Sequence, residues 1–308
     1  IADGFDFASI LVKTREGRPI KIESNNDASD FCSANARVHA SVLSMYDTKR
    51  IQNPKIKGQD SSWDELKSEF LLNLNAISKK QGKVVLLTQT FASPTTNKII
   101  KDLETKFPNI EHIILDTVPS SYAVESFKDA YGFEGLVDYD FSKSDFIVSI
   151  DADFLGDWQG GGYDTKYVSN RVPDRKTGKG RMSKHVQFES NMTLTGANAD
   201  IRVPATPTEQ KKILSYIYSE VKGLNSKIKL SPEQKENAKF AADGIKKFGS
   251  KAVIVSGLDD KNVQDLILDL NNHIRSLAIE KSARLTRTQI GSKVDVFIKE
   301  LLDGKISG

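Results

Sequence analysis

Two carboxylates at spacing two, Asp151 and Asp153, are the residues whose types and positions point most directly to chemistry. They follow an apolar run, FIVSI, that is typical of a buried strand, and alternate residues of an extended backbone point to the same side. Carboxylate oxygens presented together in this way are suitable ligands for a divalent cation. Nucleotide-sugar glycosyltransferases use an Asp-x-Asp pair at a strand end. The competing interpretation is a solvated turn.

The second candidate is Cys32, within FCSANA, which is the only cysteine in the 308 residues. A single thiol excludes an intramolecular disulfide, a CxxC redox pair and a cysteine-rich zinc or iron–sulfur site built from this chain alone. Two interpretations remain at this point. Cys32 is either a ligand whose partners are missing from the sequence or an ordinary buried thiol.

The remaining candidate residues give weaker signals. The four histidines show no HxxxH or HExxH spacing, and Ser120 and Ser121 lie outside any GxSxG motif, so we interpret the serines as a helix cap. Neither GxGxxG nor GxxxxGK[ST] follows the first predicted sheet strand. The segment 166–184 holds seven Lys or Arg and one Asp, which is typical of a solvated loop and otherwise of a docking site for an acidic partner.

Strands and helices that would position these residues can be read from the hydrophobic pattern. A hairpin turns at Glu16 and Gly17, and Ser62 with Glu65 forms the capping box of an amphipathic helix. Short apolar runs alternating with helical patterns then predict parallel sheets covered by helices. The predicted strands begin near 84, 112, 145, 185, 199 and 251, and the predicted helices cover 95–107, 121–131, 207–222, 232–247, 260–279 and 293–302.

Bulk properties limit the class of protein. A chain of 34.1 kDa with 38% hydrophobic residues can bury a full core and is long enough for two domains. A net charge of +3 is too small to indicate a nucleic-acid-binding protein. No apolar run is long enough for a membrane span. The chain begins at Ile1 without an initiator Met or a signal peptide, from which we expect a fragment of a longer protein. Residues 157–184 lack periodicity and predict a long surface loop.

Longer patterns carry a family resemblance. REGRPIKIES, FCSANARVHASVLSMYDTKRI and SSWDELKSEF occur in the order and spacing of the opening of the molybdopterin oxidoreductase family. DFIVSIDADFLGDWQ, HVQFESNMTLTGANADIRVPATPTE and GSKVDVFIKELLDGKI resemble one branch of that family, the large iron–sulfur subunit of alternative complex III, a quinol-oxidising respiratory complex. The resemblance covers nearly the whole chain. It implies an α/β fold of two helix-covered, mostly parallel sheets preceded by a small β hairpin unit.

The same resemblance implies that the cofactor sites are lost. Cys32 matches the last of four cysteines that hold a four-iron cluster in relatives, and alone it is a vestigial position. Ser120 is the nearest match to the molybdenum ligand. At the strand end that contacts the dinucleotide in relatives, this chain has Asp151 and Asp153, with the bulky Phe154 and Trp158 beside them. We therefore expect neither molybdopterin nor an iron–sulfur cluster nor another metal in this chain, and no catalytic residue of its own.

From the resemblance we expect a scaffold and docking module of a membrane-associated quinol:electron-acceptor oxidoreductase, peripheral on the periplasmic face of a bacterial inner membrane. Its partners would be other subunits of the complex, reached through the basic loop 166–184.

Alternatives are a fragment of an active molybdopterin-dependent oxidoreductase and a glycosyltransferase using Asp151 and Asp153. The expected domains are 1–60, 61–118 with 290–308, and 119–289. Since this stretch leads into a further strand of the first sheet in relatives, we expect the last dozen residues to be poorly ordered, or the open edge of that sheet to pair with another copy.

Overall fold

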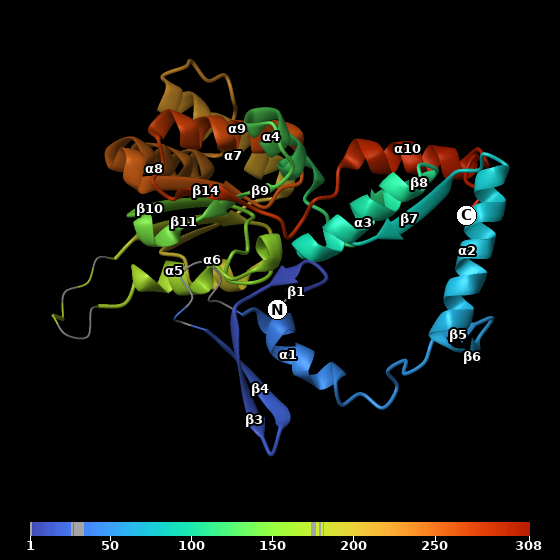
Figure 1. Ribbon diagram of the computed structural model, residues 1–308. Coiled ribbons are helices and arrows are strands. Elements are labelled where there is room, and N and C mark those ends of the chain that lie inside the picture. The colour runs from blue at the N-terminus through green and yellow to red at the C-terminus, as the bar shows by residue number, and fades with distance from the viewer. Residues whose placement is uncertain (1, 26, 28–33, 174–176, 179, 181) are drawn as a thin grey trace.

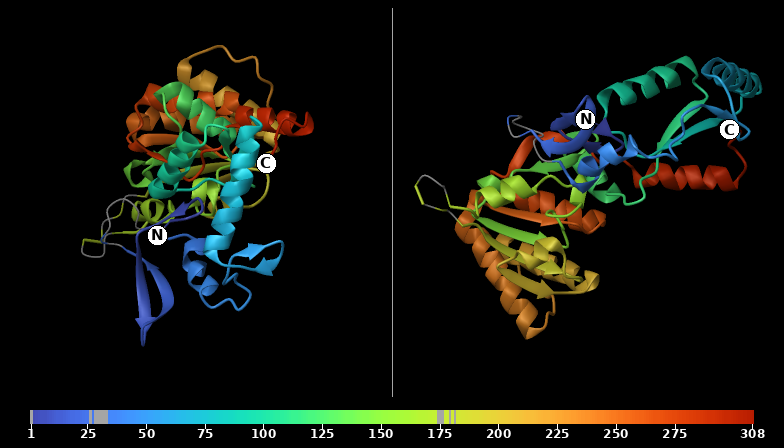
Figure 2. Two further views of the ribbon diagram at one scale, coloured as in Figure 1. Left: turned by 45° about the vertical axis from the view of Figure 1, so that its right-hand side comes forward. Right: turned by 90° about the horizontal axis from the view of Figure 1, so that it is seen from below.

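The computed structural model of the protein describes residues 2–25, 27, 34–173, 177–178, 180 and 182–308. It confirms the expected fold class, because the molecule is built of helix-covered, mostly parallel sheets and small antiparallel hairpins (Figure 1). The chain forms an α/β body, a second and smaller α/β part, and an N-terminal unit. Figure 2 shows the smaller part extending away from the body.

The N-terminal unit consists of short strands and one helix around a small core. Its core residues are Ala8, Ile22, Val38 and Val42. The predicted hairpin is present and turns at Glu16 and Gly17, which both have positive φ. The elements are β1 (Ala2–Asp3), β2 (Asp6–Phe7), β3 (Ile10–Arg15), β4 (Arg18–Ser24) and α1 (Ala36–Ser44).

The smaller α/β part begins with the predicted capping box. In α2 the Ser62 hydroxyl accepts the Glu65 N–H and the Glu65 carboxylate accepts the Ser62 N–H. Strands β7 and β8 pair in parallel, and α3 and α10 pack against β8. The elements are β5 (Lys55–Ile56), β6 (Gln59–Asp60), α2 (Trp63–Lys79), β7 (Val84–Thr88), α3 (Pro94–Lys106), β8 (Ile110–Ile114) and α10 (Gly291–Leu302).

The expectation for the last residues was wrong. Ile306 forms a parallel bridge with Lys83, the Ser307 N–H donates to the Lys83 carbonyl at 2.8 Å, and the Val85 N–H donates to the Gly308 carbonyl at 2.8 Å. The last residues therefore pair with β7 of the same chain. The turn after α10, with Gly304 at φ +67°, directs them back along β7.

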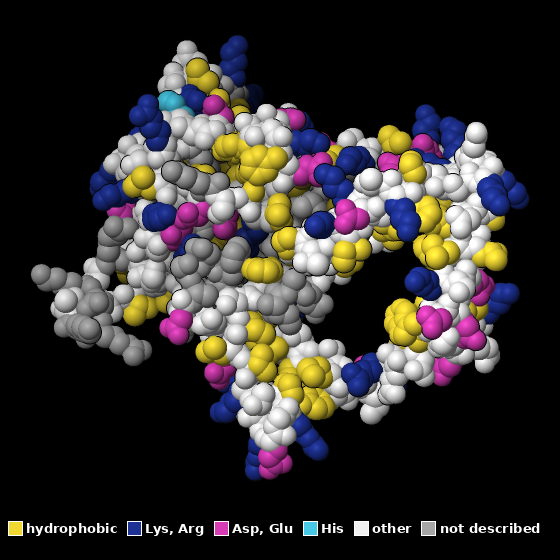
Figure 3. Space-filling model, viewed as in Figure 1, with side chains coloured by type: hydrophobic (Ala, Val, Ile, Leu, Met, Phe, Trp, Pro, Cys, Tyr) yellow, Lys and Arg dark blue, Asp and Glu magenta, His cyan; other side chains and the backbone are white. Residues whose placement is uncertain are grey.

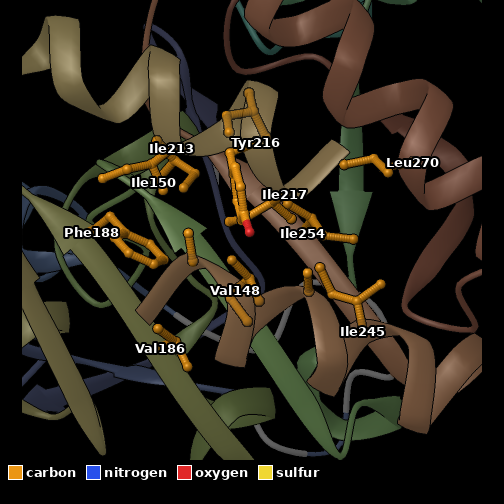
Figure 4. Packing of buried hydrophobic residues seen from close by; sticks show 14 of the residues in the cluster. Val148, Ile150, Val186, Phe188, Ile213, Tyr216, Ile217, Ile245, Ile254 and Leu270 are labelled. Carbon is orange, nitrogen blue, oxygen red and sulfur yellow. The ribbon is translucent and has the colours of Figure 1, made fainter. Parts of the chain in front are cut away.

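The body is a four-stranded parallel sheet in the order β12-β11-β10-β13. Alternate residues of β10 enter two different cores. Phe146, Val148 and Ile150 pack with residues of α7, α8 and α9, whereas Ile147 belongs to an aromatic cluster on the other side. Figure 4 shows Val148 and Ile150 in the first core. The elements are β10 (Phe146–Ile150), α5 (Asp164–Ser169), β11 (Lys184–Glu189), α6 (Leu194–Ala197), β12 (Ile201–Pro204), α7 (Pro207–Lys222), α8 (Pro232–Phe248), β13 (Ala252–Ser256) and α9 (Lys261–Ile274).

Two sequence expectations in the body need correction. The helix predicted for 260–279 ends at Ile274, because Arg275 takes a left-handed conformation at φ +53°. The following residues form β14 (Ile279–Arg284), which pairs antiparallel with β9 (Leu136–Tyr139) beside α4 (Ser121–Tyr131). The segment 157–184, expected as a long loop, contains α5 and buries Tyr163 and Tyr167.

Candidate functional site

The carboxyl edge of the body sheet is where the sequence analysis placed its sharpest candidates. Because all four strands are parallel, their carboxyl ends meet at one edge, which is where ligands bind in open α/β sheets. Asp151 follows β10, Ser190 follows β11 and Gly257 follows β13. A Cβ at Gly257 would overlap the Asp151 carbonyl, so the backbones cross in contact here and only glycine fits.

Asp151 does not continue the extended strand. Its φ is +59°, in the left-handed region, and its N–H donates to the Phe188 carbonyl at 2.8 Å. The carboxylate accepts from Gln210 Nε2 at 3.2 Å and from the Ser190 backbone, and burial raises the pKa of this carboxyl. The left-handed turn breaks the alternation that predicted a common side for Asp151 and Asp153.

Asp153 is engaged by a different element. Its Oδ1 accepts the Thr195 N–H at 3.0 Å and the Thr195 hydroxyl at 2.7 Å, and Thr195 Oγ1 in turn accepts the Leu155 N–H at 2.9 Å. The carboxylate thus fixes the loop after β10 to the start of α6. Each aspartate has its own protein partners. No group of three or more His, Cys, Asp or Glu with metal-binding geometry occurs in the part of the chain that the structure describes.

Phe154 occupies the space next to this loop. Its side chain has no solvent exposure, and its ring lies 4.4 Å from that of Phe141 and 5.3 Å from those of Tyr167 and His185. Trp158 lies further along the same loop and packs on Tyr139 at 5.6 Å. The loop that follows β10 therefore carries aromatic groups into the core below the sheet.

A buried polar row on β11 was not recognised from the sequence. His185, Gln187 and Glu189 have no solvent exposure and point to the same face of the strand. His185 Nε2 lies 3.2 Å from Gln187 Oε1, and Gln187 Nε2 donates to Glu189 Oε2 at 3.2 Å. The row ends at Arg202, whose Nε donates to the Glu189 carboxylate at 2.5 Å. Burial lowers the pKa of His185 to about 4.

The only sequence signal for this row was the alternation of polar residues with Val186 and Phe188. Such an alternation is usually interpreted as a strand with one solvated face. Here the polar face is covered instead, because Tyr167 of α5 and Phe154 pack on His185.

Ser120 occupies the N-cap position of α4, as expected, but its side chain makes no capping hydrogen bond. Asp259, just after β13, takes that role by accepting the Tyr122 N–H at 3.0 Å. Burial raises the pKa of the Asp259 carboxyl. The start of α4 is thereby brought beside the carboxyl edge that also carries Asp151.

The other candidates are only partly visible. Cys32 lies outside the described residues, and so do several charges of the basic loop 166–184. Among the described ones, Arg171 pairs with Asp200 at 3.1 Å and Lys166 lies 3.8 Å from Asp140. Arg171 is hydrogen-bonded to Asp200, whereas Lys166 is near Asp140 but beyond hydrogen-bond distance.

Acidic side chains gather at the carboxyl edge of the body sheet. Glu189 and Asp260 are neutralised by Arg202 and Lys211, whereas the Asp151 and Asp259 carboxyls have raised pKa values caused by burial. At an effective dielectric of about 20 and a separation of about 5 Å, each phosphate–carboxylate pair would cost on the order of 3 kcal/mol. A pyrophosphate would meet this repulsion only beside a carboxylate that is ionised and unpaired.

Thermal unfolding tests the glycosyltransferase alternative. We expect Mn²⁺ or Mg²⁺ with a panel of nucleotide sugars to shift Tm by less than about 1 °C, because both carboxylates already serve protein partners. A ligand at 100 times its Kd would add about 2.7 kcal/mol, a clearly visible shift. A ligand-induced stabilisation that Asp153→Asn removes and Asp145→Asn leaves intact would contradict our expectation and favour the glycosyltransferase.

Comparison with known proteins supports the fold. No protein-family model and no curated protein sequence matches the chain. The structure resembles acetylene hydratase from Pelobacter acetylenicus with a TM-score of 0.55 and 14% identity, over 88% of this chain and 42% of that one. It resembles a chain of the formyltransferase/hydrolase complex from Methylorubrum extorquens, solved with methylofuran, with a TM-score of 0.51 and 15% identity, over 82% and 73%. The chain thus spans less than half of the acetylene hydratase chain and shares its fold over that part.

Proposed function

We propose that the protein is a cofactor-free, molybdopterin-oxidoreductase-like module of a membrane-associated quinol:electron-acceptor oxidoreductase complex. Its role is that of a scaffold and docking surface for iron–sulfur electron-transfer modules on the periplasmic face of a bacterial inner membrane. The observation that carries the proposal is the loop after β10, where the family resemblance expects the dinucleotide. There the carboxylates of Asp151 and Asp153 are bound to Gln210 and Thr195, and Phe154 fills the core.

Exposed apolar side chains support a docking role. Trp63 and Phe70, seven residues apart on one face of α2, are 74% and 52% exposed, and Ile51 in the preceding segment is 78% exposed. Figure 3 shows an open space between α2 and the N-terminal unit, with hydrophobic side chains at its border. Large apolar groups in such number are typical of surfaces that another protein covers. We assign this border to contacts with other subunits of the complex.

The basic loop 166–184 remains a second proposed contact. Of its described cations, Arg171 is paired with Asp200, Lys166 lies 3.8 Å from Asp140 and Lys184 is exposed. No helix among the described residues has the length and apolar character of a membrane span.

The alternative of an active molybdopterin oxidoreductase predicts that the purified protein contains molybdenum and pterin. We expect the protein, purified with its natural flanking sequence from a host that makes the cofactor, to contain less than about 0.05 molybdenum and pterin per chain. If the carboxylates of Asp151 and Asp153 each repelled the pyrophosphate by about 3 kcal/mol, the affinity for the cofactor would fall by a factor of about 10⁴.

Elemental analysis and pterin fluorescence measure both quantities, with an intact family enzyme from the same host as the positive control. Stoichiometric molybdenum or pterin would refute the cofactor-free assignment and favour the enzyme.

A further inference from the structure

A cavity of about 270 Å³ lies between the N-terminal unit and the body, and neither Asp151 nor Asp153 is among its lining residues. Most of its wall is apolar. The N-terminal unit contributes Phe7 and Val38, the start of α3 contributes Ala92 and Pro94, and the β9–β14 pair contributes Tyr139 and Ala283.

The polar groups at one side of the cavity are satisfied by the protein. Arg284 donates to the Gly161 carbonyl at 2.5 Å and to Asp138 at 3.3 Å, and its guanidinium stacks on Tyr163 at 4.1 Å. Asn35 donates to the Gly160 carbonyl at 2.8 Å. These bonds hold the glycine run, in which φ is positive at all three residues, against the neighbouring segments. They leave Arg284 and Asn35 little capacity for a ligand.

Lys166 of α5, also in the wall, is different. Its ammonium lies 3.8 Å from Asp140 Oδ2, beyond hydrogen-bond distance, and its side chain is 32% exposed. Asp140 is shared, because Lys143 lies 3.5 Å from the same oxygen and the Ser142 hydroxyl donates to the other one. An ammonium has three donors and needs acceptors. Lys166 can therefore offer a charged donor to a molecule in the cavity.

Volume restricts the size of such a molecule. A cavity of about 150 Å³ accommodates benzene, so 270 Å³ is enough for a fused two-ring system but not for a dinucleotide. We propose that this cavity binds a small aromatic monocarboxylate, with the rings between Val38, Pro94 and Tyr139 and the carboxylate on Lys166. This inference goes beyond the proposed scaffold function and does not rest on it.

Two matched probes test the proposal. 2-Naphthoate carries the carboxylate, and 2-naphthalenemethanol has the same rings without the charge. We expect naphthoate to bind in a saturable manner and about tenfold more tightly than the alcohol, measured by isothermal titration calorimetry on the full chain. Lys166→Gln should remove that difference by weakening naphthoate alone. Lys184→Gln, at an exposed lysine of the same basic run, is the matched control and should change neither affinity.

A second variant tests the place of binding. Ala283→Phe fills the cavity and should abolish binding of both probes, and Ala92→Leu, from a different element, does the same if the first variant fails to fold. The proposal is wrong if neither probe binds below about 1 mM. It is also wrong if Lys166→Gln leaves naphthoate binding unchanged, or if both filled variants bind like the parent chain.

Discussion

Replacing Phe154 by alanine is expected to lower the free energy of unfolding by about 4 kcal/mol. The ring is fully buried between Phe141, Tyr167 and His185, so its loss leaves a cavity that the surrounding side chains close only in part. Since domains of this kind are stable by roughly 5 to 15 kcal/mol, the change removes a large share of the total. Urea denaturation followed by circular dichroism measures the effect.

Phe70→Ala is the matched control for this substitution. The same atoms are removed from α2, where Phe70 is 52% exposed, and the expected loss is below about 1 kcal/mol. Equal effects of the two substitutions would contradict the packing described here. A small effect of Phe154→Ala alone would mean that the loop after β10 can collapse or rearrange. That result would also weaken the argument that this loop fills the dinucleotide site.

Acidification is expected to destabilise the protein through His185. Burial lowers the pKa of His185 to about 4 in the folded chain, against about 6.5 when unfolded. Between these values the unfolded chain binds a proton that the folded chain does not, so the free energy of unfolding falls as the pH decreases. The expected loss from this group is about 2 kcal/mol by pH 5 and about 3 kcal/mol by pH 4.

Urea titrations at pH 7.5, 6, 5 and 4 measure this dependence. His185→Gln should flatten it, even if the variant is less stable at every pH. His273→Gln, at an exposed histidine on α9, is the matched control and should keep the parent slope. The charged groups that act on His185 are Arg171, Asp200 and Glu189, and all three are paired or hydrogen-bonded in the fold. An unchanged slope in His185→Gln would assign the acid lability to the carboxylates Asp200 and Glu189 instead.

Local signals in the sequence determined most helices and all strands of the body sheet. Thr206 and Ser231, each followed by proline, begin α7 and α8, and glycine follows the last residue of both helices. The run FIVSI predicted β10, since a strand buried on both faces is apolar at successive positions. These signals suffice because caps and apolar runs act within a few residues of the chain.

The site was less predictable, because its geometry depends on residues that are distant in sequence. The spacing of Asp151 and Asp153 predicted a shared side, but the left-handed turn at Asp151 and the partners Gln210 and Thr195 separate them. The left-handed conformation accompanies the close crossing with Gly257, about a hundred residues later in the chain. No local pattern specifies such a crossing.

By itself, the sequence determined the fold class, the hairpin, the capped helices and the parallel strands, because local propensity and hydrophobic periodicity encode them. Only the tertiary structure decided which polar residues are buried and which segments pair at a distance. His185 became a core residue because α5 covers it, and 279–284 became β14 rather than helix because β9 offered a free edge. Burial and strand pairing are properties of the assembled chain, so the residues concerned look locally like a solvated strand face and the end of a helix.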